Sequence, residues 1–226
     1  MSVLLSRSFP SRYGAPVIDR FDPRIFQLTF FAKCMSCDFC HDACCQFGVD
    51  IEMPRVAALD AHRDELEAYL GVPRSEWFRD DPDDFGIETE PDYPGGAYTR
   101  TGVAELPVGR SGHSEEACVF LDPVNRGCRI HRFALERGID VHDIKPMVCL
   151  MFPVLHAEGK LIPAIEFEEG LLVCEGPGDS LYRAAREDLL YYFGSELVAE
   201  LDLFETACVR EPAKPDGNRI PLAIGA

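Results

Sequence analysis

Half of the cysteines in this chain stand in one short segment. Residues 34–45, CMSCDFCHDACC, contain Cys34, Cys37, Cys40, Cys44 and Cys45. The first four follow the spacing C-x2-C-x2-C-x3-C, which is typical of the bacterial ferredoxin segment that holds cubane iron–sulfur clusters. Two features argue against a ferredoxin: Cys45 stands where a proline would follow, and no second compact run of cysteines occurs. The segment therefore predicts a thiolate metal site of another kind.

Four of the remaining cysteines stand beside turn-forming residues, in the contexts CVFL, GCRIH, KPMVCLMFP and CEGPG. They are Cys118, Cys128, Cys149 and Cys174. One such cysteine alone is most often an inert buried thiol. Together with segment 34–45 they supply up to nine thiols, which suffice for two four-cysteine sites or one site of higher nuclearity.

The adjacent pair Cys44 and Cys45 bears on the kind of site. Neighbouring side chains point to opposite sides of an extended chain and about 100° apart on a helix, so they rarely serve one small tetrahedral site. The pair therefore favours two sites, or one multinuclear site that it bridges. Structural zinc usually takes two C-x2-C pairs, and only the first half of that pattern is present. Zinc is allowed by the spacing without being favoured.

The composition favours a cytoplasmic protein. A formal net charge of -17 over 226 residues repels phosphate backbones and anionic lipids, so we expect neither nucleic acid nor a membrane as partner. A basic redox or substrate protein would fit this charge.

No signal-peptide core is found, and no apolar run reaches about eighteen residues. Because cytoplasmic thiols stay reduced, clustered cysteines are expected to bind metal or to act in redox chemistry rather than to form disulfides.

Short strands and packing helices are predicted around the cysteines. Residues 1–33 are predicted to be an extended lead-in that ends in a strand-like stretch at 25–32. Apolar spacing, with Pro54 at one start and glycines at the ends or breaks, predicts helices at 53–71, 131–138 and 180–207. A hairpin is predicted at 154–167.

These elements predict an α+β fold class. We expect a small, irregular, metal-bound cysteine-cluster domain over residues 34–178, with the lead-in 1–33 before it and a C-terminal helical segment, 179–226, packed on it. The motifs of nucleotide hydrolases, dinucleotide-binding proteins and serine hydrolases are absent from the sequence.

The order of the cysteine contexts resembles a known family. The opening C-x2-C followed by CC, then C-x-F-L, C-x-I-H, K-P-x-x-C-x-x-F-P and a late C-x-G, is similar to the pattern of the YkgJ-type CxxCxxCC cysteine-cluster proteins, which are described as zinc- or iron-chelating domains. The resemblance covers about residues 34–178. Position by position, it implies the ligands Cys34, Cys37, Cys44, Cys45, Cys118, Cys128, Cys149 and Cys174. Cys40 is an additional thiol in a gap that the family leaves variable, and Cys208 has no counterpart.

The resemblance also implies a cofactor and three alternative functions. A similar domain occurs in the much longer flagellin lysine methylases, where a cysteine-bound iron–sulfur centre accompanies methyl transfer. This implies one or two iron–sulfur clusters of the 4Fe–4S type, with Zn as the alternative. The chain would then serve electron transfer or a redox or methyl-transfer reaction. The alternatives are an iron enzyme with an open metal position and a zinc-stabilised interaction module without catalysis.

Several other residues are secondary candidates. His131, His41 and His142 lie close in sequence to predicted ligands and could bind metal, although packing roles are equally expected. Lys145 and Arg129 could balance the negative charge of several thiolates, since clustered anions in a protein interior need nearby cations and hydrogen-bond donors.

Overall fold

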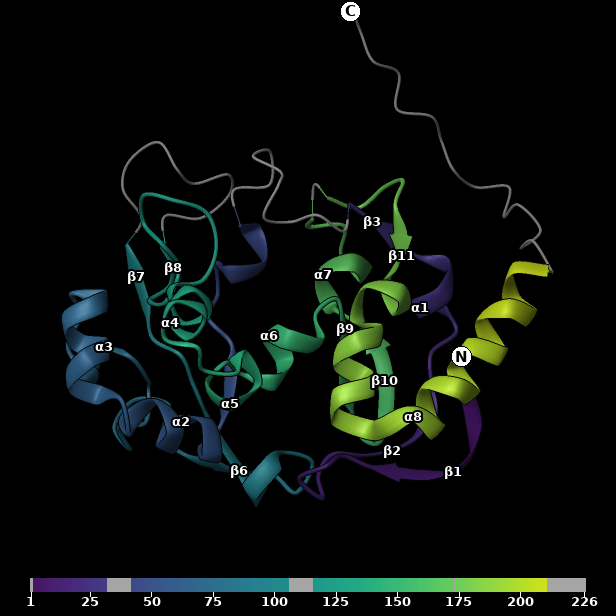
Figure 1. The fold of residues 1–226 in the computed structure, drawn as a ribbon, viewed down its shortest axis with the longest axis horizontal. Coiled ribbons are helices and arrows are strands. Elements are labelled where there is room, and N and C mark those ends of the chain that lie inside the picture. The colour runs from purple at the N-terminus through teal and green to yellow at the C-terminus, as the bar shows by residue number, and fades with distance from the viewer. Residues whose placement is uncertain (1, 32–41, 106–115, 173, 211–226) are drawn as a thin grey trace, which may run out of the picture.

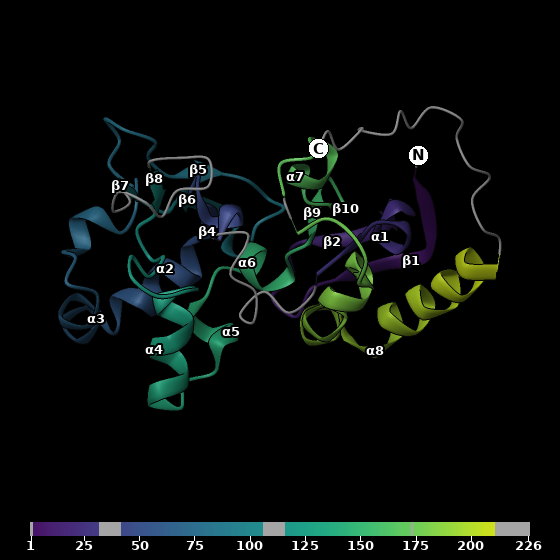
Figure 2. The ribbon, with the colours of Figure 1, turned by 90° about the horizontal axis from the view of Figure 1, so that it is seen from above.

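The computed structural model of the chain describes residues 2–31, 42–105, 116–172 and 174–210. These residues form two lobes, each around its own hydrophobic core (Figure 1). The two ends of the described chain build one lobe, which we call the sheet lobe. Residues 50–105 and 116–144 build the other, which we call the middle lobe. The two lobes stand side by side when seen from above (Figure 2).

A four-stranded sheet in the order β1-β2-β10-β9 is the centre of the sheet lobe. Its strands are β1 (Val3–Pro10), β2 (Val17–Phe21), β9 (Val154–Ala157) and β10 (Lys160–Pro163). β2 and β10 run parallel, and the other two pairs are antiparallel. The N-terminal strands and the later hairpin thus share one sheet, which buries Ile18 and Leu161 completely.

Helices and a second strand pair cover this sheet. They are α1 (Arg24–Gln27), α6 (Met147–Met151), α7 (Ile165–Glu168) and α8 (Leu181–Arg210), together with the paired strands β3 (Thr29–Phe30) and β11 (Asp179–Ser180). The rings of Phe26 on α1 and Tyr182 on α8 meet edge to face, 5.1 Å apart. Gly178 lets β11 approach β3, because a Cβ atom at Gly178 would lie 2.0 Å from the Phe30 carbonyl oxygen.

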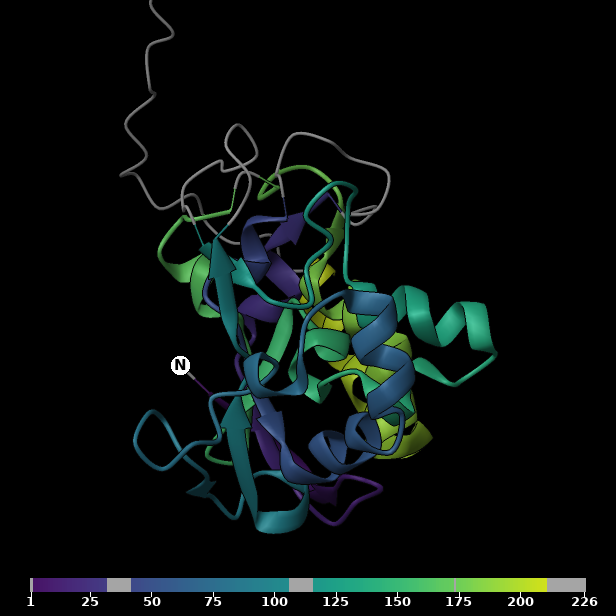
Figure 3. The same cartoon turned by 90° about the vertical axis from the view of Figure 1, so that its left-hand side faces the viewer.

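In the described residues, the middle lobe combines short strands with helices (Figure 3). Its strands form the sheet β4-β6-β5 and the pair β7-β8, which are β4 (Asp50–Glu52), β5 (Glu88–Thr89), β6 (Ala97–Arg100), β7 (Val103–Glu105) and β8 (Glu116–Cys118). Its helices are α2 (Met53–Asp60), α3 (Arg63–Leu70), α4 (Arg129–Arg137) and α5 (Val141–Ile144). Three 3-10 turns are η2 (Ala43–Cys45), which precedes the lobe, η3 (Arg74–Glu76) and η4 (Pro94–Gly96). Fully buried Trp77 and Phe133 anchor the core of this lobe.

A buried ion pair helps to join the two lobes. Glu52 and Arg55 lie 3.3 Å apart, with 2% and 8% of their side chains exposed. Arg55 donates a hydrogen bond to the hydroxyl of Tyr13, which lies between β1 and β2, and another to the carbonyl of Asp143 on α5. Glu52 accepts a hydrogen bond from the backbone N–H of Met147, the first residue of α6. One carboxylate of the middle lobe therefore sets the position of a sheet-lobe helix.

The mixed composition of helices and small sheets confirms the predicted α+β class. Helix α4 ends at Gly138 as predicted, because this glycine takes the left-handed conformation with φ 66°. The hairpin β9–β10 and the break of α8 at Gly194 are also confirmed.

Two local predictions were wrong. The helix predicted at 53–71 is two helices, α2 and α3, which are separated at Ala61 and His62. The strand predicted at 25–32 is the short helix α1 followed by the two-residue strand β3. The apolar residues of this stretch would be buried in the same core in a helix or in a strand. Their hydrophobicity therefore did not predict which backbone conformation they adopt.

His156 on β9 gives this fold a testable pH dependence. Its ring meets that of Tyr93 from the middle lobe at 5.9 Å, and its buried Nδ1 atom has no hydrogen-bond partner among the described residues. Burial lowers the pKa of His156 from 6.5 to about 4, although Asp92 opposes this shift. The folded protein thus keeps this histidine neutral while the unfolded chain takes up a proton below pH 6.5. As the pH falls from 6.5 to 4, His156 should therefore lower the free energy of unfolding by up to about 3 kcal/mol.

Urea unfolding of the wild type and of a His156→Phe variant at pH 7 and pH 4.5 measures this effect. The variant should lose less stability than the wild type on acidification, because it has no ring to protonate. Equal losses in the two proteins would contradict a buried neutral His156.

Candidate metal centre

Five cysteines from four separate segments gather where the two lobes meet. They are Cys44 and Cys45 on η2, Cys118 at the end of β8, Cys128 at the N-terminus of α4 and Cys149 on α6. All five are half-buried free thiols. Cys44 packs against the core of the sheet lobe, whereas Cys118 and Cys128 pack against the core of the middle lobe.

A tight loop brings Cys118 and Cys128 together. Leu121 and Cys128 form a β-bridge, and the backbone N–H of Asp122 donates to the carbonyl of Gly127 at 2.9 Å. The Asp122 carboxylate accepts hydrogen bonds from the backbone N–H groups of Val124 and Asn125. These bonds fix the turn that connects Leu121 to Cys128. Two cysteines ten positions apart in sequence are thus placed at the base of one loop.

Asp42 connects η2 to this loop. Its carboxylate forms two hydrogen bonds with the guanidinium group of Arg126, at 2.8 Å and 2.7 Å, and its carbonyl accepts the N–H of Cys45. Asp42 has a positive φ of 59°, a conformation that Asp and Asn tolerate better than most residues. The pair holds the adjacent cysteines against the loop that carries Cys128.

This ion pair can be tested by an Asp42→Asn substitution, which keeps the tolerance for positive φ and removes the charge. Because residues that orient metal ligands typically contribute 10–100-fold to metal affinity, we expect roughly tenfold weaker binding of Zn²⁺ to the apoprotein. Competition with a chromophoric chelator measures the affinity. An Asp84→Asn variant, which removes the exposed ion pair with Arg79 in the middle lobe, serves as the control and should bind Zn²⁺ like the wild type. Equal affinity in all three proteins would exclude a positioning role for Asp42.

Cys149 is fixed by the start of α6. Pro146 precedes the helix, and its carbonyl accepts the backbone N–H of Cys149 at 3.1 Å. The hydrogen bond from Met147 to Glu52 fixes the same turn from the side of the middle lobe. The rigid K-P-x-x-C context thus orients one thiol, as its proline suggested.

The five thiols are close enough to influence one another's ionisation. Burial raises the pKa of Cys118 to about 11, although a hydrogen bond with Thr101 opposes this shift. Burial also raises the pKa of Cys149, and the neighbouring Cys128, Cys118 and Cys44 act in the same direction. The hydrogen bond between the thiols of Cys44 and Cys45, followed by burial, raises the pKa of Cys45. The same hydrogen bond lowers the pKa of Cys44. Ionisation of Cys45, Cys118 and Cys149 would be favoured by a nearby positive charge.

Lys145 supplies one such charge. Burial acts to lower the pKa of its ammonium group, but Cys128, Cys149, Cys45 and Cys44 outweigh burial and raise it. Arg129 contributes a smaller share: its charge acts to lower the pKa of Cys118, while its guanidinium group donates to the backbone carbonyls of Leu70 and Val119. Of the two cations that the sequence singled out, Lys145 is the one whose ionisation responds to four of the thiols.

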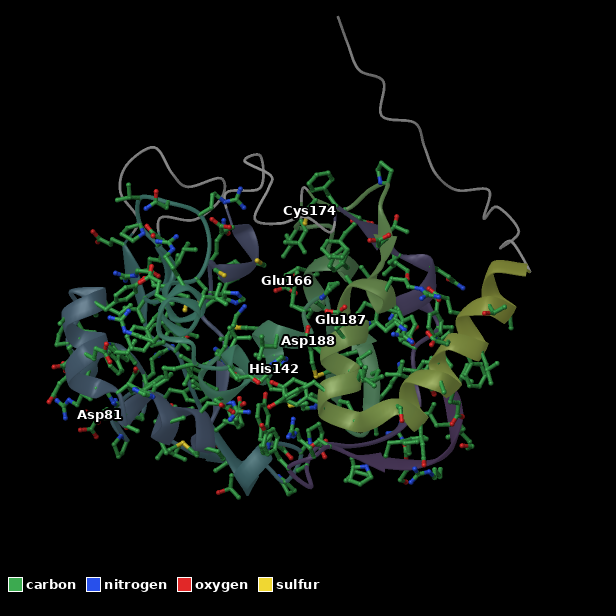
Figure 4. All side chains as sticks on the ribbon, in the orientation of Figure 1. Asp81, His142, Glu166, Cys174, Glu187 and Asp188 are labelled. Carbon is green, nitrogen blue, oxygen red and sulfur yellow. The ribbon has the colours of Figure 1, made fainter. Side chains whose placement is uncertain are left out.

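Cys174 occupies a different position. It is buried in the core of the sheet lobe, where Figure 4 labels it, and its backbone carbonyl accepts a hydrogen bond from the N–H of Phe31. Cys34, Cys37 and Cys40 lie outside the described residues, as does His41. The described residues on either side of 32–41 are Phe31 beside Cys174 and Asp42 beside Arg126.

Two of the candidate histidines, His131 and His142, lie in the described residues, and no hydrogen bond joins either of them to a described thiol. His142 lies between the carboxylates of Asp140 and Asp188, at 2.7 Å and 2.9 Å, and stacks on Tyr191 (Figure 4). It thereby links α5 to α8. Burial lowers the pKa of His131, and the charges of Lys145 and His142 act in the same direction.

Sequence analysis missed two acidic residues that surround the site, Asp42 and Glu52. Each contacts a residue distant in the chain, so spacing gave no signal for it. Asp42 could most easily have been identified from the sequence, because it stands inside segment 34–45.

Among the residues that the structure describes, no three His, Cys, Asp or Glu side chains converge closely enough to hold a metal ion. The five thiols are thus neighbours that do not form a closed coordination sphere by themselves. In the described part of the chain, no helix combines the length and apolar character needed to cross a membrane. No protein-family model, curated protein or solved structure matched this chain.

Proposed function

We propose that this chain is a cysteine-cluster metalloprotein that holds one or two iron–sulfur clusters of the 4Fe–4S type. The supporting observation is the gathering of five free thiols and Lys145 at the junction of two hydrophobic cores. Thiols from so many separate segments are a costly arrangement for a core that needs only packing, because aliphatic side chains would fill the same space without ionisable groups. A metal centre to which several of these thiols bind would explain why they gather.

The chemistry of the donors fits this cofactor. Thiolates are soft ligands that select iron–sulfur clusters, Zn²⁺ or Cu⁺ over hard cations. Adjacent Cys44 and Cys45, with Cys118 and Cys149 as neighbours of Cys45, suit a multinuclear centre better than a single tetrahedral ion. Cys34, Cys37 and Cys174 are proposed to complete the ligand set, as the resemblance to the YkgJ-type family implies. Cys40 is an additional candidate that the family pattern does not include.

A bound iron–sulfur cluster would supply one-electron chemistry, and the proposed role is electron transfer or support of a redox or methyl-transfer reaction. Lys145 would offset part of the thiolate charge. The net charge of -17 would favour a partner protein with a basic surface.

Zinc is the second candidate. It is favoured by the position of the thiols between two lobes, where a metal ion would hold the lobes together as a structural site does. In that case the protein would be an interaction module without catalysis.

Elemental analysis of anaerobically purified protein, with acid-labile sulfide on the same sample, distinguishes these proposals. Iron with matching sulfide, at about four or eight atoms per chain, is the expected result for four-cysteine clusters. Zinc without sulfide would support the structural alternative. Protein that contains neither metal and binds neither on reconstitution would overturn both.

A further inference from the structure

An apolar groove lies between α8 and β1, on the side of the sheet lobe away from the middle lobe (Figures 1 and 2). Its volume is about 590 Å³, which falls in the range of pockets that hold ligands. The lining residues are Ser6 on β1 and Ala199, Glu200, Leu203, Phe204 and Ala207 on α8. Leu203 is 73% exposed, whereas the ring of Phe204 lies 4.9 Å from that of Phe21 in the core of the sheet lobe. A large exposed leucine thus stands in a groove whose floor joins the core.

The lining of the groove follows one stripe along the helix. Ala199, Leu203 and Ala207 are spaced four residues apart, so their side chains lie in a row on one face of α8. From Ala199 to Ala207 this row spans about 12 Å, at 1.5 Å per residue. It leads toward Arg210, the last residue of α8, after which the chain continues with residues 211–226. The groove therefore opens beside the point at which this segment leaves the helix.

The sequence of that segment matches the groove in length and polarity. Residues 211–226 lie outside the described residues, and their sequence is EPAKPDGNRIPLAIGA. It begins with polar residues, contains the turn-forming sequence PDG at 215–217 and continues into the apolar run IPLAI at 220–224. Five extended residues cover roughly 16 Å, which is enough for the whole row. The nine residues 211–219 reach up to about 30 Å, so they can return the run from Arg210 to any point of the groove.

The charge at the groove favours this segment over a second copy of the chain. Glu200 accepts hydrogen bonds from the N–H and the hydroxyl of Ser6, both at 2.7 Å, and forms no ion pair among the described residues. The segment 211–219 contains Lys214 and Arg219, so it brings a cation to this carboxylate. Two copies that met through this face would instead place two such carboxylates in one interface, where like charges reduce affinity. Covalent attachment also gives the segment a high effective concentration at the groove.

We propose that the apolar run 220–224 of the same chain docks in this groove, with Leu222 against Leu203. Residues 211–226 then form a strap across the end of α8 and its contact with β1. Docking removes the exposed apolar surface of Leu203 and of the run from water, which is the main favourable contribution to such a contact. This inference does not depend on the metal centre.

Photo-crosslinking of the full-length protein tests the strap. The photoreactive residue p-benzoylphenylalanine replaces Leu203 and, in a control protein, Leu135 on α4, which is 65% exposed in the middle lobe. A mixture of ¹⁵N-labelled and unlabelled protein is irradiated and digested with trypsin, and mass spectrometry identifies the crosslinked peptides. We expect a crosslink from position 203 to residues 220–226 of the same chain, and none from position 135 to these residues. A crosslink from position 203 to another chain would assign the groove to a second copy and overturn the inference, as would the absence of any crosslink to residues 211–226.

A pair of substitutions in the segment separates docking from chance proximity. In the protein with the photoreactive residue at position 203, Leu222→Asp should lower the yield of the crosslink at least about fivefold, because the variant loses the burial of a leucine and would have to dehydrate a carboxylate. Ala213→Asp makes the same charge change in the polar part of the segment and should leave the yield unchanged. Equal yields in the two variants would show that the apolar run is not held in the groove and would overturn the inference.

Discussion

Replacing Cys45 or Cys149 with serine should leave the purified protein with less than about half of its metal, since a hydroxyl is a poor substitute for a thiolate ligand. Cys45 has Cys44, Cys118 and Cys149 as neighbours, and Cys149 stands on a helix fixed by Pro146 and Glu52. Both positions are therefore central to the proposed site. Metal and sulfide content per chain, measured after anaerobic purification, gives the result.

Cys208→Ser is the matched control. Cys208 belongs to the last turn of α8. The C-terminal end of this helix lies on the side of the sheet lobe away from the middle lobe (Figures 1 and 2). The variant should keep the metal content of the wild type. Equal metal in Cys45→Ser, Cys149→Ser and Cys208→Ser would refute the assignment of the ligands. Cys174→Ser tests the extent of the centre. A loss of metal from this variant would show that the centre includes Cys174 in the core of the sheet lobe.

The second large effect is expected at the buried ion pair between the lobes. Arg55→Met should lower the free energy of unfolding by about 3–5 kcal/mol, because removal of one partner leaves the other charge buried and uncompensated. The uncompensated group is Glu52, of which 2% is exposed. Burial already raises the pKa of Glu52 against the opposing effect of Arg55. Urea unfolding at pH 7 measures the change.

The pH dependence of this variant has a defined sign. A carboxyl group whose pKa is raised in the folded state stabilises the protein at low pH and loses that contribution as the pH rises through the raised value. Without Arg55 the pKa of Glu52 should rise further. The deficit of Arg55→Met should therefore be smaller at pH 5 than at pH 7.

Two further variants make the ion-pair result specific. Arg63→Met removes an exposed ion pair with Glu67 at the same 3.3 Å separation, and it should leave stability unchanged because solvent screens that pair. The double variant Glu52→Gln, Arg55→Met should recover part of the loss, since neither charge remains buried. If Arg55→Met and Arg63→Met were equally stable, Glu52 and Arg55 could not join the lobes as described.

Parts of the fold could be predicted from local residues. Gly138 and Gly71 end their helices because both take a left-handed conformation that residues with a Cβ atom disfavour. The hairpin β9–β10 follows from two apolar runs around a short polar turn. These elements depend on interactions within a few residues, so the sequence alone contained the necessary information.

Other elements depended on distant partners. Residues 3–10 and 17–21 were predicted as part of an extended lead-in. The second of these strands, β2, pairs with β10, in which Lys160 is the partner of Arg20, 140 positions earlier in the chain. The stretch 25–32 became α1 and β3 because its apolar residues pack against α8 and β11. No local pattern encodes such a choice of partner.

The sequence by itself determined the residue types of the candidate site: a set of ordered cysteine contexts, a K-P-x-x-C turn and an acidic chain. The tertiary structure alone decided which thiols are neighbours. It placed Cys44 and Cys45 within electrostatic range of Cys118 and Cys149, and placed Lys145 within range of Cys128 and these thiols. The physical reason is that ionisable groups interact through space over a few ångströms, and two separate hydrophobic cores had to pack together before these groups could meet.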